Sequence, residues 1–151
     1  MKKYISQQEA LSLLQKYCAY QERCHREVRT KLLSLGIYGE YLEEIIGSLI
    51  EEDYLNEIRF AKTYARGKFR MKAWGRIKII QSLKQKGIND YCIKEAMKEI
   101  NPADYKEALH LILVQQLEKC PDLPPFERKS KAFRYALSRG FESPLIEEFF
   151  G

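Results

Sequence analysis

Apolar residues recur along the chain at the three- and four-residue spacing of amphipathic helices. In the first such stretch, Leu11, Leu14 and Cys18 share one face. Just before them, Ser6 and Glu9 form a capping box, which is typical of a helix start. The sequence has no sustained apolar–polar alternation and no Asn-Gly or Asp-Gly hairpin turn. The pattern therefore predicts an all-α protein.

A six-residue pattern occurs three times, each time after a glycine. The glycines are Gly36, Gly87 and Gly140, which lie 51 and 53 residues apart and follow basic amphipathic segments, as C-terminal helix caps do. The pattern reads apolar, apolar, charged, acidic, apolar, apolar, and it falls at residues 41–46, 92–97 and 145–150. At 100° per residue, the two apolar pairs share one helix face and pack inward.

Each copy of this pattern belongs to a larger unit of helices. An amphipathic segment precedes each glycine, at residues 27–35, 75–86 and 128–139, and a third helix is expected at residues 6–18, 56–70 and 102–118. This predicts tandem three-helix repeats, with three units and about nine helices, at residues 1–53, 54–100 and 101–151. Since one unit buries its apolar face poorly alone, neighbouring units should stack. The alternative is chance similarity among amphipathic helices.

Charge is distributed unevenly along the chain. The formal net charge is +5, but residues 1–58 carry −3, residues 59–86 carry +10 and residues 87–151 carry −2. The middle segment contains no acidic residue. Its cations are Arg59, Lys62, Arg66, Lys68, Arg70, Lys72, Arg76, Lys78, Lys84 and Lys86. Such a concentration of positive charge favours an anionic partner.

The spacing of these cations suggests how they are displayed. Arg59, Lys62, Arg66 and Arg70 follow one another at steps of three and four, so they form a stripe on the helix that Asn56 caps. Lys68 and Lys72 are expected to widen that stripe, and the cations of the next helix to continue it. We interpret this surface as a contact for nucleic-acid phosphates or a filament; the alternative is a solvated face that only aids solubility.

Two aromatic residues in the basic segment have two possible roles. Trp74 and Phe69 are candidates for stacking on bases. A single tryptophan at a helix start is more often part of a core or an interface, and both readings stay open at this stage.

Sequence signals for catalysis and for cofactors are absent. The sequence contains no P-loop, G-x-G-x-x-G, H-E-x-x-H or G-x-S-x-G motif, so we expect no enzyme and no cofactor. Its four cysteines form no C-x-x-C pair and are expected to be free thiols. A zinc site built from Cys18, Cys24, His25 and His110 is an alternative, but this spacing matches no structural zinc pattern.

The chain also shows no sign of export or membrane insertion. Its longest nearly apolar stretch, residues 108–114, is far shorter than the ~20 residues of a membrane span. The start has two lysines, Lys2 and Lys3, with no apolar run behind them. We therefore expect a cytoplasmic protein that does not contact membranes.

Several motifs of the chain resemble the RecX family of bacterial regulators. Residues 55–64, LNEIRFAKTY, are similar to that family's L-N-D-x-x-F-A-x-x-Y signature, and residues 27–32, EVRTKL, to its E-L-R-x-K-L element. Residues 76–88 and 131–141 resemble its basic segments that end in glycine and an apolar residue. The chain departs from the pattern at Glu57, where the family has aspartate, and at Leu35, where it has a basic residue.

The resemblance implies an elongated, curved array of three stacked repeats and a macromolecular partner. That partner is the filament of RecA recombinase on single-stranded DNA, whose recombinase, ATPase and co-protease activities family members mostly lower. It implies no catalytic residue, and we expect a monomer that contacts single-stranded or duplex DNA weakly and without sequence preference. Two other functions stay open: a stand-alone nucleic-acid-binding module and a helical scaffold for another protein.

Overall fold

The computed structural model describes residues 5–151, which form nine helices and no strand. The helices are α1 (Gln7–Tyr20), α2 (His25–Ser34), α3 (Gly39–Glu51), α4 (Glu57–Lys72), α5 (Arg76–Gln85), α6 (Asp90–Met97), α7 (Pro102–Lys119), α8 (Pro125–Ser138) and α9 (Ser143–Phe150). The all-α prediction is thus confirmed. Lys2 and Lys3, on which the expectation about the start of the chain partly rests, lie outside the described range.

The local signals of the sequence fix most helix ends. Ser6 Oγ accepts a hydrogen bond from the backbone N–H of Glu9 at 3.1 Å, which caps α1. The glycines after α2, α5 and α8 adopt the left-handed conformation, with φ of +81° at Gly36, +80° at Gly87 and +97° at Gly140. A residue with a Cβ adopts this conformation at a cost, so the glycines end their helices as predicted.

Two helices begin earlier than the sequence pattern indicated. Helix α2 starts at His25 rather than Glu27, because carboxylates satisfy the free N–H groups of its first turn. The N–H of Cys24 donates to Glu27 at 3.1 Å, and the N–H of His25 donates to Glu57 of α4 at 2.8 Å. Helix α8 starts at Pro125 rather than Arg128, since proline suits the first turn of a helix.

The helices pack against one another in consecutive threes. We refer to α1–α3 as the first repeat, α4–α6 as the second and α7–α9 as the third. The exact domain boundaries, residues 1–53, 54–100 and 101–151, stay a prediction. One feature of the repeat pattern is wrong: Tyr41 is 62% exposed, whereas its counterpart Cys92 is buried. Helix α3 therefore buries only the second residue of the first apolar pair, Leu42.

The second and third repeats share one hydrophobic core. At their joint, Gly75 and Gly140 bring two backbones into contact: the N–H of Gly75 donates to the carbonyl of Arg139 at 2.7 Å, and that of Ile77 to Gly140 at 3.0 Å. A Cβ on Gly75 would lie 2.3 Å from backbone atoms of Gly140, so only glycine fits there. The two repeats are consequently held together by both apolar packing and direct backbone hydrogen bonds.

The first repeat has a separate core and joins the second mainly through polar contacts. The Arg26 guanidinium of α2 donates to the carbonyl of Gln85 at the end of α5, and Glu22 pairs with Arg59. Among the residues that the structure describes, Cys24 alone comes from the first repeat into the core of the second and third. This joint is therefore looser in construction than the joint between the second and third repeats.

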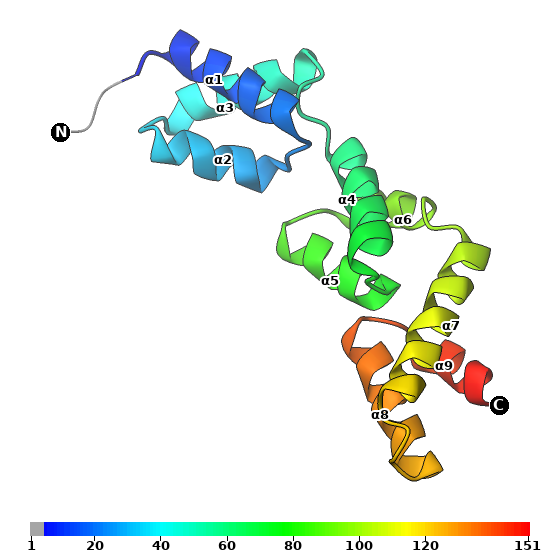
Figure 1. Cartoon of the computed structure of the whole chain (residues 1–151). Helices are drawn as coiled ribbons and strands as arrows, with labels where there is room; N and C mark the ends of the chain where they lie inside the picture. Colours follow the sequence, from blue (N-terminus) through cyan, green and yellow to red (C-terminus); the bar gives the residue numbers. More distant parts are fainter. Residues whose placement is uncertain (1–4) are drawn as a thin grey trace.

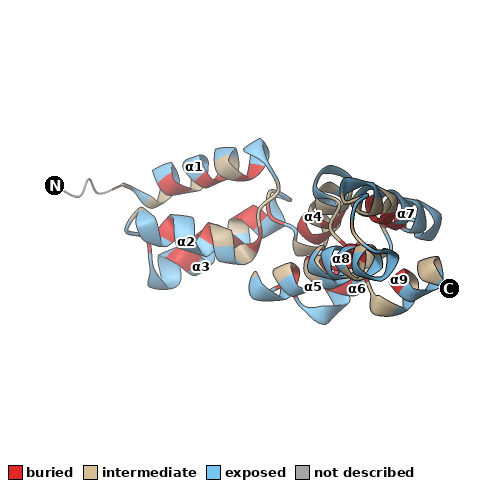
Figure 2. Ribbon diagram, turned by 60° about the horizontal axis from the view of Figure 1, so that its bottom comes forward, coloured by how far each residue is buried: buried red, intermediate tan, exposed pale blue. Residues whose placement is uncertain are grey.

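The three repeats follow one another in a long, bent molecule (Figure 1). The described part of the chain begins at one end and Gly151 lies at the other, with the second repeat in the middle. Buried positions form a stripe inside each group of three helices, while exposed positions cover the outside (Figure 2). The basic segment, residues 59–86, thus occupies the centre of the array and has surface on more than one side.

Candidate nucleic-acid interface

The buried face of helix α4, and the stripe of cations opposite it, agree with the prediction from the sequence. Asn56 caps the helix by accepting from the N–H of Arg59 at 3.0 Å. Phe60, Ala61 and Ala65 are buried against the rest of the repeat. The apolar face thereby fixes the rotation of α4, and the stripe of Arg59, Lys62, Arg66 and Arg70 lies away from that face.

The cations of α4 nevertheless divide between two faces. At 100° per residue, Lys68 lies about 160° around the helix from Arg66. In the structure, the Lys68 ammonium lies over the rings of Tyr64 and Trp74, toward α5, whereas Arg66 pairs with Glu99 after α6. The expectation that Lys68 widens the arginine stripe is therefore wrong, because Lys68 belongs to a second basic face.

Three arginines of the segment are neutralised by carboxylates from other parts of the fold. Arg59 contacts Glu22 at 2.6 Å and Asp53 at 3.1 Å, Arg66 contacts Glu99 at 3.1 Å, and Arg76 contacts Glu142 at 2.8 Å. The expectation of a continuous surface without acidic neighbours is thus wrong at these positions. A segment that lacks acids in sequence still meets them in space, since the turns between other helices supply them.

These ion pairs tie elements together rather than face a partner. Arg76 of α5 also stacks its guanidinium 3.9 Å from the ring centroid of Tyr105 in α7, and Glu142 lies at the start of α9. Partial burial acts to lower the pKa of Arg59, but the hydrogen bond and charge of Glu22 outweigh it, so its pKa is raised above the ordinary value. Arg59 is thereby held charged at the joint between the first and second repeats.

The remaining seven cations of the segment are free of such pairs. Within residues 5–151, none of them has a carboxylate oxygen within 4.0 Å. They are Lys62, Lys68, Arg70, Lys72, Lys78, Lys84 and Lys86. Every lysine of the segment is in this group, while three of its four arginines are not. The positive charge available to a partner is therefore mostly ammonium.

The two aromatic candidates for base stacking occupy different environments. The Phe69 ring lies 5.8 Å from the Tyr105 ring and packs against the shared core, so it does not face a base. Trp74 is partly exposed, and the ammonium groups of Lys68 and Lys78 lie 4.9 Å and 4.7 Å from its ring. Phe69 therefore packs in the core rather than stacking on a base, while lysine ammonium groups lie over the ring of Trp74.

Sequence reasoning did not identify the lysine–aromatic contacts. A signal for one of them is present: Tyr64 and Lys68 are four residues apart on α4, which is the spacing of neighbours on a helix surface, whereas Trp74 lies in the turn before α5. Tyr105 was also missed as a joint residue. Its hydroxyl accepts from the N–H of Arg76 at 2.9 Å and donates to Glu142, and nothing in the sequence pairs these three residues.

Comparison with known proteins agrees with this architecture. Residues 56–97 match the model of the second three-helix domain of RecX. Regulatory protein RecX of Pelodictyon phaeoclathratiforme is 30% identical over 121 residues, which cover 80% of this chain and 74% of that protein. The chain belongs to the RecX family. The resemblance seen in the sequence motifs is thus confirmed.

Other RecX proteins extend the similarity to nearly the whole chain. Regulatory protein RecX of Lactobacillus johnsonii is 30% identical over 147 residues, or 97% of this chain, but the matched part is only 54% of its own length. The crystal structure of RecX from Lactobacillus salivarius superimposes with a TM-score of 0.87 at 25% identity, covering 95% of this chain and 94% of that one. The stacked three-helix repeats are therefore the RecX fold.

The same fold offers neither a membrane span nor a metal site in its described part. Within residues 5–151, each helix is too short or too polar to cross a bilayer. No three His, Cys, Asp or Glu side chains of that range come close enough together to hold a metal ion, so the zinc alternative has no geometric support. The four cysteines are free thiols, and burial raises the pKa of Cys18, Cys24 and Cys92.

Proposed function

We propose that this chain is a non-catalytic regulator of RecA recombinase. It binds the filament that RecA forms on single-stranded DNA and lowers the recombinase, ATPase and co-protease activities of that filament during DNA repair, recombination and the SOS response. Membership in the RecX family of regulatory proteins supports the proposal. The chain acts as a monomer in the cytoplasm, without a cofactor.

One structural observation carries the proposal: the middle of a long molecule displays seven cations that form no ion pair with any residue of the described range 5–151. A filament of protein on DNA is a polyanion with many identical sites along a helical groove. An elongated array of repeats presents an extended surface to such a groove. The central positive charges attract the filament electrostatically. The three units at residues 1–53, 54–100 and 101–151 then touch neighbouring protomers.

Regulation follows from this binding without any bond being made or broken. A ligand shifts an equilibrium between two states only through different affinities for them. If the chain binds one arrangement of filament protomers more tightly than another, it draws the filament toward that arrangement, and activities that need the other decline. The ten cations of residues 59–86 divide into two roles here: seven contact the partner, and Arg59, Arg66 and Arg76 hold the surface in shape.

The first prediction concerns the recombinase. Added to RecA from the same organism and single-stranded DNA, the chain lowers the DNA-stimulated ATP hydrolysis rate in a dose-dependent manner, which a coupled ATPase assay measures. The control is the rate of RecA without DNA. An unchanged DNA-stimulated rate at saturating protein would reject the proposed function.

A further inference from the structure

Three lysines and two aromatic residues of the second repeat form one alternating row. The ammonium groups of Lys86 and Lys68 lie 5.7 Å and 5.3 Å from the ring centroid of Tyr64, and those of Lys68 and Lys78 lie 4.9 Å and 4.7 Å from that of Trp74. We call these five residues the lysine–aromatic row. It runs across α4 and α5, from the joint with the first repeat to the joint with the third.

The row is held in place by its surroundings. The hydroxyl of Tyr64 hydrogen-bonds to the hydroxyl of Ser82 on α5, and Trp74 packs against the shared core. Each ring attracts the ammonium groups above it, as cations and aromatic faces do within about 6 Å. Because the Lys86 and Lys68 ammonium groups share the Tyr64 ring, they are no more than about 11 Å apart. The three charges are therefore ordered before any ligand arrives.

The lysines of the row form no ion pair in the described structure. None of the three has a carboxylate oxygen within 4.0 Å in the described part of the chain. Two glutamates, Glu22 and Glu27, line the same cavity as Lys68 and Lys86. Glu22 pairs with Arg59, whereas Glu27 accepts from the N–H of Cys24 and keeps its negative charge. The three row lysines therefore carry positive charge that no carboxylate contacts directly.

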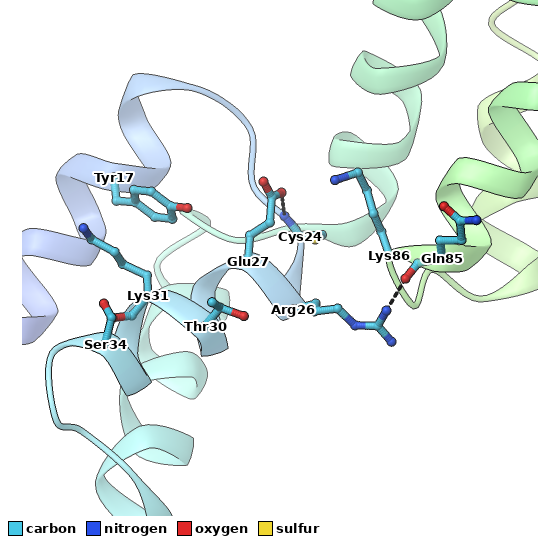
Figure 3. A pocket seen from close by; sticks show the side chains of 9 residues that line it. All are labelled: Tyr17, Cys24, Arg26, Glu27, Thr30, Lys31, Ser34, Gln85 and Lys86. Carbon is cyan, nitrogen blue, oxygen red and sulfur yellow. Dashed lines mark hydrogen bonds between the residues drawn. The ribbon is translucent and has the colours of Figure 1, made fainter.

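A further lysine, in the first repeat, lines the same cavity as one end of the row. Lys86 lines a cavity of about 320 Å³ between α2 and α5, and Tyr17 and Lys31 line its other side (Figure 3). The ammonium of Lys31 lies 5.8 Å from the centroid of the Tyr17 ring, which repeats the arrangement of the row. A strand-like polyanion that follows the row toward the first repeat meets another ordered lysine there.

We propose that the lysine–aromatic row binds the phosphodiester backbone of a nucleic acid through its phosphates alone. The proposal rests on the proposed function for its site and names the chemical contact. Ammonium groups are compact, strongly hydrated charges that bind phosphates without fixed geometry. Three of the four arginines of the segment, which would grip carboxylates of a protein with paired hydrogen bonds, instead pair with carboxylates inside the fold.

The same geometry argues against recognition of bases. The exposed faces of Tyr64 and Trp74 are where bases would stack, and lysine ammonium groups already lie over them. Ordered lysines also lose less side-chain freedom on binding than free ones, so the contact is favourable even without base recognition. Binding is consequently independent of sequence and of the presence of bases.

Fluorescence anisotropy with labelled DNA and without recombinase tests the row directly. The test variant is Lys68→Gln, Lys78→Gln and Lys86→Gln together, which removes the three charges and keeps a polar side chain at each position. The control is Lys16→Gln, Lys94→Gln and Lys119→Gln, which removes the same charge from exposed positions outside residues 59–86 and contacts no aromatic ring within residues 5–151. We expect the test variant to bind oligothymidylate about tenfold more weakly, and to lower the salt dependence by about 0.7 per lost phosphate contact; the control changes affinity less than about threefold.

Three further arms decide between the remaining interpretations. A strand of the same length without bases binds as oligothymidylate does, and duplex DNA shows whether the row accepts one or both forms of the backbone. Replacing the three row lysines by arginine restores binding, because the charge returns. Equal losses in the test and control variants, failure of the baseless strand to bind, or wild-type protein that binds RecA but no DNA would each overturn the proposal. The last result would leave the proposed function standing.

Discussion

At the scale of single residues, arginine and lysine have separate tasks in the second repeat. Arg59 and Arg76 reach carboxylates of neighbouring repeats and form charged hydrogen bonds at the two joints. A guanidinium is suited to this, since its planar donors match a carboxylate. The lysines are left outside, where their charge serves a partner. Replacing Arg59 or Arg66 by glutamate would set like charges against Glu22 or Glu99, so such variants test folding rather than binding.

Tyr105 offers a test of the joint between the second and third repeats. It is fully buried, and burial together with the hydrogen bond to Glu142 raises its pKa far above the ordinary value. Tyr105→Phe leaves the N–H of Arg76 and the Glu142 carboxylate without this partner. We expect a loss of about 1–3 kcal/mol in the free energy of unfolding, measured by urea denaturation.

The matched control for that variant is Tyr91→Phe. The Tyr91 side chain is 63% exposed, and no hydrogen bond of its hydroxyl occurs in the described structure. Its removal should change the free energy of unfolding by less than about 0.5 kcal/mol. Equal stability of the Tyr105 variant and the wild type would show that the buried hydroxyl does not hold the joint.

At the scale of helices, local sequence signals set most helix boundaries. A contact from another repeat sets the start of α2, which those signals miss. Asn56 and the glycine caps act through their own turns, which is why the pattern placed α4, α5 and their neighbours closely. The first turn of α2 is capped from α4 by Glu57, a contact that no local pattern reveals. Local rules therefore predict helix boundaries well, except where a residue of another repeat caps the helix.

Gly75 provides the prediction at this scale. Its missing Cβ lets the start of α5 touch the turn after α8, and an added Cβ would lie 2.3 Å from backbone that no side-chain rotation can move. Gly75→Ala should lower the free energy of unfolding by about 1–3 kcal/mol, as overpacking does. Chemical denaturation measures this loss.

Gly67→Ala in the middle of α4 is the control. A Cβ added there would have no neighbouring atom within 4 Å, so the variant should be more stable than the wild type by about 0.5–1 kcal/mol. A Gly75 variant as stable as the wild type would mean that the two backbones are not in contact.

At the scale of the whole molecule, the fold was predictable and the division of the basic surface was not. A period of about fifty residues, a glycine and a six-position pattern were enough for three repeats of three helices. The ten cations could be listed from the sequence, but their partners could not. Glu22, Glu99 and Glu142 come from 37, 33 and 66 residues away, and only the stacking of helices brings them to the arginines.

The two joints also differ in the contacts that form them. Backbone hydrogen bonds and a common core unite the second and third repeats, whereas polar side chains and a cavity separate the first repeat from the second. The lysine–aromatic row spans the middle repeat between these joints. A partner that follows the row therefore passes from a joint built on a shared core to a joint built mainly on polar contacts.

The most direct test of the account is co-sedimentation with filaments of RecA on single-stranded DNA. The account predicts that the wild-type chain pellets with the filaments and that Lys68→Glu, Lys78→Glu and Lys86→Glu together leave it in the supernatant, with helical circular dichroism unchanged. If the charge-reversed chain pelleted as the wild type does, the lysine–aromatic row would not be what holds this protein to its polyanionic partner.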